Sequence, residues 1–180
     1  GDYGLWVGLL DEDGLAVGPP HLIGQINVAG RSRLFQAPRF AHQVDAQLGG
    51  GATLLGYDLP EMTINPGEDL SPVLYWRADG RMSVAYTVFV HLIDRNQHVW
   101  AQQDNQPVQG TCPTTSWLPG EIIVDEYLLR VPEDAPEGTY WLEVGLYDAV
   151  TGRRLPGVDA QGQKLESDRI LLGEVAVRGR

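Results

Sequence analysis

Apolar and polar residues alternate with a period of two through the middle of the chain. One face carries Val84, Tyr86, Val88, Val90 and Leu92, and the other carries Ser83, Ala85, Thr87, Phe89 and His91. A polar stretch follows at residues 94–97, and then a second apolar run extends to Asp104. Alternation of β-branched and aromatic residues around a polar turn is typical of a β-hairpin. We therefore predict a hairpin over residues 86–104 and place it at the centre of a β-sandwich, with the first set facing the core.

Short apolar runs separated by glycine, proline and acidic residues recur along the rest of the chain. The further predicted strands are residues 3–11, 22–30, 52–59, 70–76, 121–131, 140–148 and 171–179. No apolar period of 3.6 residues persists, so very little helix is expected. Regularly spaced short strands with turn residues between them predict an all-β fold, an antiparallel β-sandwich of immunoglobulin-like or jelly-roll-like type.

Two stretches near the beginning of the chain recur near its end. Residues 3–11 (YGLWVGLLD) match residues 140–148 (YWLEVGLYD), and residues 22–30 (LIGQINVAG) match residues 171–179 (LLGEVAVRG). We interpret these matches as a tandem repeat, in which the second copy carries a longer loop. In this interpretation residues 1–30 are the terminal strands of a truncated preceding copy. Residues 31–51 are then a linker, and residues 52–180 a complete β-sandwich domain.

The truncated copy has two strands, Gly4–Leu10 and Leu22–Val28, that lack a sandwich of their own. Apolar strands with free edges tend to pair with another edge. We expect these strands to pack on the complete domain or to exchange with a second chain, which would give a homodimer through residues 3–28. The sequence leaves both arrangements open.

Composition and spacing argue against several classes of function. The net charge of −11 argues against nucleic acid, which is bound by clustered lysine and arginine. Cys112 is the only cysteine, so neither an internal disulfide nor a cysteine zinc site is expected. The acidic turn at residues 11–14 lacks the calcium-loop pattern of an EF-hand, and the four histidines lack metal-site spacing, so no metal or cofactor is expected. No nucleophile elbow or other catalytic constellation occurs, and we expect a chain without enzyme activity. No apolar run is long enough to span a membrane in this segment.

A series of motifs resembles one family. They are LLGYDL, PGEDL followed by LYW, YTVFVHLID, AQQD, SWLPGE, EGTYWLEVGLYD and TGRRLP, which together cover residues 52–177. The series resembles the extracytoplasmic C-terminal β-sandwich repeats of multipass membrane glycosyltransferase-like proteins of the protein-mannosyltransferase type, found in filamentous green bacteria. The resemblance implies a segment of a membrane-anchored parent that lies outside the cytoplasm. It carries over no catalytic residue, because the transferase chemistry of this family resides in its membrane part.

Aromatic residues that point away from the predicted core are the best candidates for a binding site. In residues 140–148 the core set leaves Trp141, Glu143 and Tyr147 on the opposite face. The remaining candidates are Phe89 and His91 on the second face of the hairpin, with Trp100 and Trp117 nearby in sequence. Aromatic rings beside carboxylates and amides suit sugars, whose C–H faces stack while their hydroxyls form hydrogen bonds. The predicted function is glycan or acceptor binding by an accessory domain. The alternative is a structural spacer that stacks on a neighbouring repeat, with the same aromatics serving only in packing.

Overall fold

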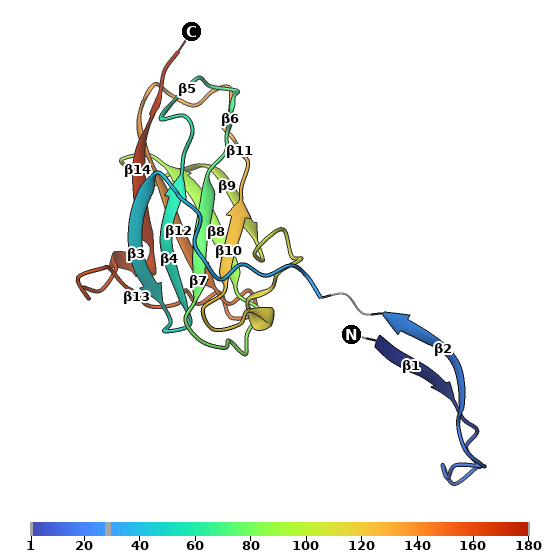
Figure 1. Ribbon diagram of the computed structural model, residues 1–180. Coiled ribbons are helices and arrows are strands. Elements are labelled where there is room, and N and C mark those ends of the chain that lie inside the picture. The colour runs from blue at the N-terminus through green and yellow to red at the C-terminus, as the bar shows by residue number, and fades with distance from the viewer. Residues whose placement is uncertain (1, 28–29, 180) are drawn as a thin grey trace. The chain divides into compact units, whose positions relative to one another are not determined.

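The computed structural model describes residues 2–27 and 30–179, and it divides into two compact units after Arg33. The first unit holds one antiparallel pair, β1 (Asp2–Val7) and β2 (His21–Asn27) (Figure 1). The second unit holds every other strand of the described residues. Of the strand predicted over residues 22–30, residues 28 and 29 lie outside the described residues.

The second unit contains two five-stranded sheets. In the first sheet the order is β10 (Ile122–Glu126), β7 (Val73–Ala78), β4 (Ala52–Asp58), β3 (His42–Leu48) and β13 (Gly157–Val158). In the second it is β5 (Thr63–Ile64), β14 (Ile170–Val177), β12 (Gly138–Tyr147), β8 (Thr87–Ile93) and β9 (Val99–Asn105). A separate short ladder joins β6 (Asp69–Leu70) to β11 (Leu129–Arg130), and two 3-10 helices cover Thr114–Ser116 and Glu166–Asp168. Within the described residues every ladder is antiparallel except β14 with β5. The predicted all-β antiparallel sandwich with very little helix is confirmed.

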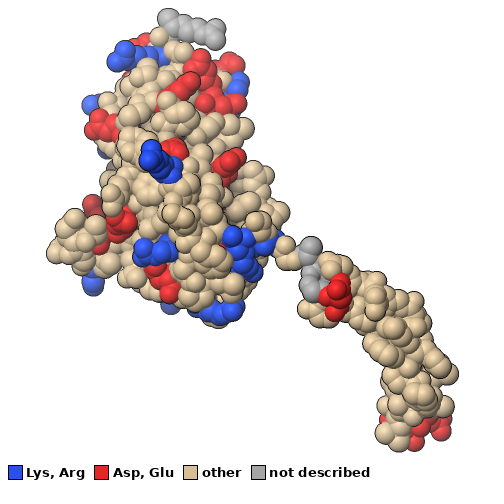
Figure 2. All heavy atoms as spheres, viewed as in Figure 1, with Lys and Arg blue, Asp and Glu red and all other residues tan. Residues whose placement is uncertain are grey.

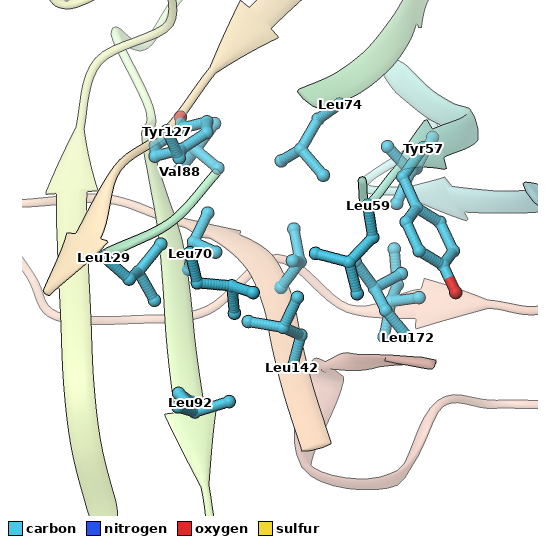
Figure 3. Close-up of a cluster of buried hydrophobic side chains, with 14 of the residues drawn as sticks. Tyr57, Leu59, Leu70, Leu74, Val88, Leu92, Tyr127, Leu129, Leu142 and Leu172 are labelled. Carbon is cyan, nitrogen blue, oxygen red and sulfur yellow. The ribbon is translucent and has the colours of Figure 1, made fainter. Parts of the chain in front are cut away.

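The core lies between the two sheets, where alternate residues of facing strands converge. Figure 3 shows leucine side chains from both sheets meeting in this space, among them Leu74 and Leu142. Val88, Val90 and Leu92 of β8 are fully buried here, as the alternating pattern predicted. Burying one such side chain contributes about 1.5–3 kcal/mol, so this layer dominates the stability of the sandwich.

The predicted hairpin is present as β8 and β9, but it is not the centre of its sheet. β9 forms an edge, whereas β12 pairs with β14 on one side and with β8 on the other. The ten residues of β12 are largely buried on both faces, as expected of a central strand. The strand that organises this sheet is therefore β12.

Part of the predicted linker belongs to the sandwich. Residues 42–48, placed in the linker by the sequence analysis, form β3 and pair with β4 and β13. Ala46 and Leu48 face the core and are 2% and 0% exposed. Their alternation is short, and an irregularity around Asp45, whose φ is 56°, interrupts it. The sandwich unit accordingly begins at Leu34 and not at Ala52.

Candidate functional site

The outer face of the second sheet brings four of the seven predicted site residues together. Glu143 lies opposite His91 in the β12–β8 ladder, and Tyr147 lies in the same row of β12. The ring of Phe89 is 5.0 Å from that of His91 and 6.3 Å from that of Tyr147, measured between centroids. This grouping follows from the period of two, because residues of equal parity share one face of a sheet.

Glu143 is the centre of a buried group of charges, which we call the Glu143 cluster: Glu143, His91, Asp104, Arg154 and Arg169. Glu143 is only 4% exposed. One of its oxygens, Oε2, accepts from Arg169 Nη1 at 2.6 Å, and Oε1 lies 3.0 Å from His91 Nδ1 and 3.5 Å from Arg154 Nη2. The other ring nitrogen of His91 lies 3.0 Å from Asp104 Oδ1. A carboxylate with this little exposure is stable only if it is paired, and here three basic groups converge on it.

The long loop between β12 and β14 closes over this face. It supplies Arg154, whose guanidinium carbon lies 4.2 Å from the centre of the Phe89 ring and whose Nη1 donates to the Ser167 carbonyl at 3.2 Å. Phe89 is consequently 1% exposed. Gly145 leaves room for this ring against β12, since a Cβ there would lie 2.5 Å from two ring atoms. Phe89 was predicted as part of a binding surface, and the arginine stacked on it makes it a packing residue instead.

The cluster shifts the pKa of both its central groups. Burial alone would lower the pKa of His91, but hydrogen bonds and charge from Asp104 and Glu143 outweigh burial and raise it to about 9. Burial alone would raise the pKa of Glu143, but the hydrogen bonds from His91 and Arg169 and the charges of both arginines lower it to about 2. His91 and Glu143 are therefore both charged at neutral pH.

Raising the pH is expected to weaken the sandwich through His91. Because folding raises the pKa of His91, its contribution is fully present below the ordinary histidine value and is lost as the pH rises through about 9. The midpoint of urea unfolding should thus fall between pH 7 and pH 9.5, and His91→Gln should flatten this fall. His98→Gln, which changes an exposed imidazole, serves as the control. An equal slope in wild type and His91→Gln would contradict the assignment.

Trp141 lines a separate cavity at the end of the same face. The cavity has a volume of about 470 Å³ and is lined by residues 94–96 of the β8–β9 turn, residues 136–139 before and at the start of β12, Tyr140 and Trp141. Trp141 is half-buried, and around it stand Asp94, Asn96, Glu137 and Thr139. The lining of this concave site thus combines an aromatic residue with residues that carry carboxylate, amide and hydroxyl groups.

The Glu143 cluster is hydrogen-bonded to the β8–β9 turn, whose residues 94–96 line the Trp141 cavity. Arg169 Nη1, which pairs with Glu143, also donates to Gln97 Oε1 in the β8–β9 turn. Gln97 has a φ of 64°, a left-handed conformation that a non-glycine residue adopts at some cost. Asp94 fixes the other end of the turn, since its Oδ1 accepts from the backbone N–H groups of Asn96 and His98. The turn is thus anchored at both ends.

The two remaining predicted residues lie elsewhere. Trp117 is 0% exposed and belongs to the core between the sheets, where its Nε1 donates to the Cys112 carbonyl at 2.9 Å. It was predicted as a ligand-binding residue and is a core residue, because its loop turns inward at the 3-10 helix. Trp100 is partly buried against the core, and its Nε1 donates to Asp94 Oδ2 at 3.1 Å. Through this hydrogen bond Trp100 stabilises the β8–β9 turn that lines the Trp141 cavity.

Sequence reasoning missed Arg154, Arg169 and Gln97. The two arginines lie 11 and 26 residues from Glu143 along the chain, so no local spacing links them to it. It also missed a larger cavity of about 590 Å³, lined by residues 49–51, 80–83, 148, 151 and 153–156 with Tyr86. This cavity contains three arginines, Arg81, Arg153 and Arg154. Tyr86 is its one aromatic lining residue, so it fits a stacked sugar less well than the Trp141 cavity.

Neither a metal site nor a membrane helix is found in the part of the chain that the structure describes. Within residues 2–27 and 30–179, no three His, Cys, Asp or Glu side chains gather in a way that could hold a metal ion. No described helix is long and apolar enough to cross a membrane.

The fold has counterparts among solved structures. The C-terminal domain of Wzt aligns with a TM-score of 0.51 and 11% identity, over 80% of this chain and 82% of that domain. The CARDB domain of the PF1109 protein from Pyrococcus furiosus aligns with a TM-score of 0.39 and 12% identity, over 83% of this chain and all of that domain. No family model and no curated protein sequence matches the chain. The first likeness shows a shared β-sandwich fold, and at this identity it shows no more.

Proposed function

We propose that this chain is a non-catalytic accessory segment of a membrane glycosyltransferase-like protein, lies on the extracytoplasmic face, and binds glycan in the Trp141 cavity. The motif series in residues 52–177 supports the parent protein, since it resembles the C-terminal repeats of that family. The β-sandwich fold, shared with a domain that is itself the C-terminal part of Wzt, agrees with an accessory role.

One observation carries the glycan proposal: Trp141 lines a concave site together with residues that can form hydrogen bonds. A pyranose presents an apolar C–H face to such a ring and directs its hydroxyl groups to the rim. Asn96, Glu137 and Thr139 provide amide, carboxylate and hydroxyl partners around the cavity. Because Arg169 and Asp94 anchor the turn that forms one wall, the site is preorganised and loses little entropy on binding.

Substitution of Trp141 by alanine is expected to weaken glycan binding with little loss of stability. Removing the ring removes the stacking platform, which should weaken binding at least about 10-fold. Binding is measured on a glycan array and then by calorimetry with the best ligand. Trp6→Ala is the matched control, since Trp6 is 58% exposed in the first unit and far from this cavity in sequence. Equal binding by Trp141→Ala and Trp6→Ala would contradict the proposal.

The second candidate function is a structural spacer without ligand. It is favoured by the Glu143 cluster, whose charges pair with one another and with the chain's own loop. In that case no glycan binds the wild-type protein, and Trp141→Ala changes only the unfolding free energy. The array and the unfolding curve together separate the two functions.

A further inference from the structure

The pair β1–β2 has the same register as the pair β12–β14. Tyr3 is paired with Ile26, and Tyr140, its counterpart in the sequence match, is paired with Val175, the counterpart of Ile26. Both ladders are interrupted by an irregularity near the middle. Beyond it the pairing again agrees: Trp6 with Leu22 and Val7 with His21 in the first pair, Glu143 with Leu171 and Val144 with Ile170 in the second. The sequence match thus extends to the geometry of the ladder.

The turn that follows β1 also matches the turn that follows β12. Three backbone hydrogen bonds recur at equivalent positions, although the second turn is one residue longer. In the first copy the N–H groups of Asp11, Gly14 and Val17 donate to the carbonyls of Leu15, Asp11 and Leu9. In the second copy those of Asp148, Gly152 and Leu155 donate to the carbonyls of Arg153, Asp148 and Leu146. The agreement now covers the strand, its bulged ladder and its turn.

The two pairs differ in burial. The core-facing residues of β12, Tyr140, Leu142, Val144 and Leu146, are 0–2% exposed, whereas their counterparts Tyr3, Leu5, Val7 and Leu9 are 49–73% exposed. Residues 3–10 and 14–27 contain no Asp, Glu, Lys or Arg, and Figure 2 shows the β1–β2 strand pair tan with red at its two ends. An exposed strand pair that is apolar and uncharged indicates a surface that is normally covered, as it would be inside a sandwich.

Three members of the Glu143 cluster have counterparts in the first copy, and all three are replaced by uncharged residues. Trp6 stands at the position of Glu143, Ala16 at that of Arg154, and Pro20 at that of Arg169. The carboxylate and both arginines are therefore absent together, which leaves no buried charge on this strand pair. A strand that paired with β1 as β8 pairs with β12 would place its counterpart of His91 opposite Trp6 and not opposite a carboxylate.

We infer that β1–β2 ends another sandwich of this type, and that its free edge takes a strand equivalent to β8 from a copy preceding residue 1 in a longer parent chain. In the second copy the edge of β12 opposite β14 pairs with β8, with Val144 opposite Val90 and Leu146 opposite Val88. The corresponding edge of β1 forms no ladder among the described residues. A β8-like strand beside β1, together with the facing sheet of the same sandwich, would bury the alternate residues from Tyr3 to Leu9.

A fusion protein tests this inference. Residues 34–137, which carry every strand of the sandwich before β12, are placed before residue 1 of the full chain, with His91→Thr in the added copy. Cys112→Ser is made in both copies, with Val7→Cys in the chain and Val90→Cys in the added copy. We expect a disulfide within one chain, seen by mass, and amide exchange of β1 slowed at least about 100-fold relative to the unfused chain. Leu92→Cys in the added copy, made in place of Val90→Cys and displaced from it by two residues, should cross-link far less.

Three results would overturn the inference. One is an added segment that stays unstructured beside an unprotected β1. Another is a disulfide between two chains, which would show strand exchange in a homodimer instead. The third is β1 protection that is already present in the unfused monomer and unchanged by the fusion, which would show that the pair packs on its own chain. Each result is read from mass, oligomeric state and exchange, and none depends on glycan binding.

Discussion

Replacing Glu143 by glutamine is expected to lower the free energy of unfolding by about 3–5 kcal/mol, because it removes the counter-ion of the buried Arg169 and one of the two carboxylates that pair with His91. Arg169 and His91 both pair with this carboxylate, and their side chains are only 13% and 12% exposed. Glutamine keeps the size of the side chain, so the loss reports charge and hydrogen bonding and not a cavity. Urea unfolding followed by fluorescence measures it.

The matched control for Glu143→Gln is Asp69→Asn. Asp69 pairs with Arg130 at 3.2 Å, and the two side chains are 41% and 66% exposed. Such surface pairs contribute about 0–1 kcal/mol. If Glu143→Gln cost no more than Asp69→Asn, the cluster would be no stronger than a surface ion pair.

Acid should act on the wild-type protein through the same carboxylate. Folding lowers the pKa of Glu143 to about 2, so its stabilising contribution is full above the ordinary glutamate pKa and is lost as the pH falls through about 2. Glu143→Gln should remove this part of the acid sensitivity. The stabilising contributions of Glu143 and His91 are thus both full only between the ordinary pKa of glutamate and the ordinary pKa of histidine.

The part of the candidate site that alternation alone determines could be predicted from the sequence. The period of two along β8 and β12 placed His91 and Glu143 on one face, and the structure pairs them across the ladder. The same reasoning predicted Trp141 and Tyr147 on that face. These predictions needed only local sequence, because side-chain direction in a strand follows from parity.

The rest of the site depends on how distant segments meet, which no local pattern shows. After β12 the chain crosses to pair with β3 through β13 and then returns to begin β14. This path carries Arg154 and Arg169 over Phe89 and Glu143. Parity could show that Phe89 points away from the core, but it could not show that a loop covers it. β3 was missed for a similar reason. Its short alternation is interrupted at Asp45, and only its pairing with β4 shows that it is a strand.

Replacing Trp117 by alanine is expected to lower the free energy of unfolding by about 3–5 kcal/mol, as for large aromatic side chains in other cores. Trp117 is 0% exposed and follows the 3-10 helix that turns its loop inward. That helix is itself attached to the segment before β8, since Thr114 Oγ1 donates to the Val84 carbonyl at 2.7 Å and accepts from the Tyr86 N–H at 2.9 Å. The alanine variant therefore leaves a cavity and loosens the loop as well.

The substitution Trp117→Phe separates packing from hydrogen bonding. Phenylalanine keeps much of the ring but loses the donor to the Cys112 carbonyl, which should cost about 1–3 kcal/mol. Trp6→Ala, at a residue 58% exposed, should change stability by no more than about 0.5 kcal/mol. Urea unfolding of the three variants gives the order Trp117→Ala, Trp117→Phe, Trp6→Ala, from most to least destabilised. If Trp117→Ala instead lost glycan binding at unchanged stability, Trp117 would have to contact the ligand, and its place in the core would be wrong.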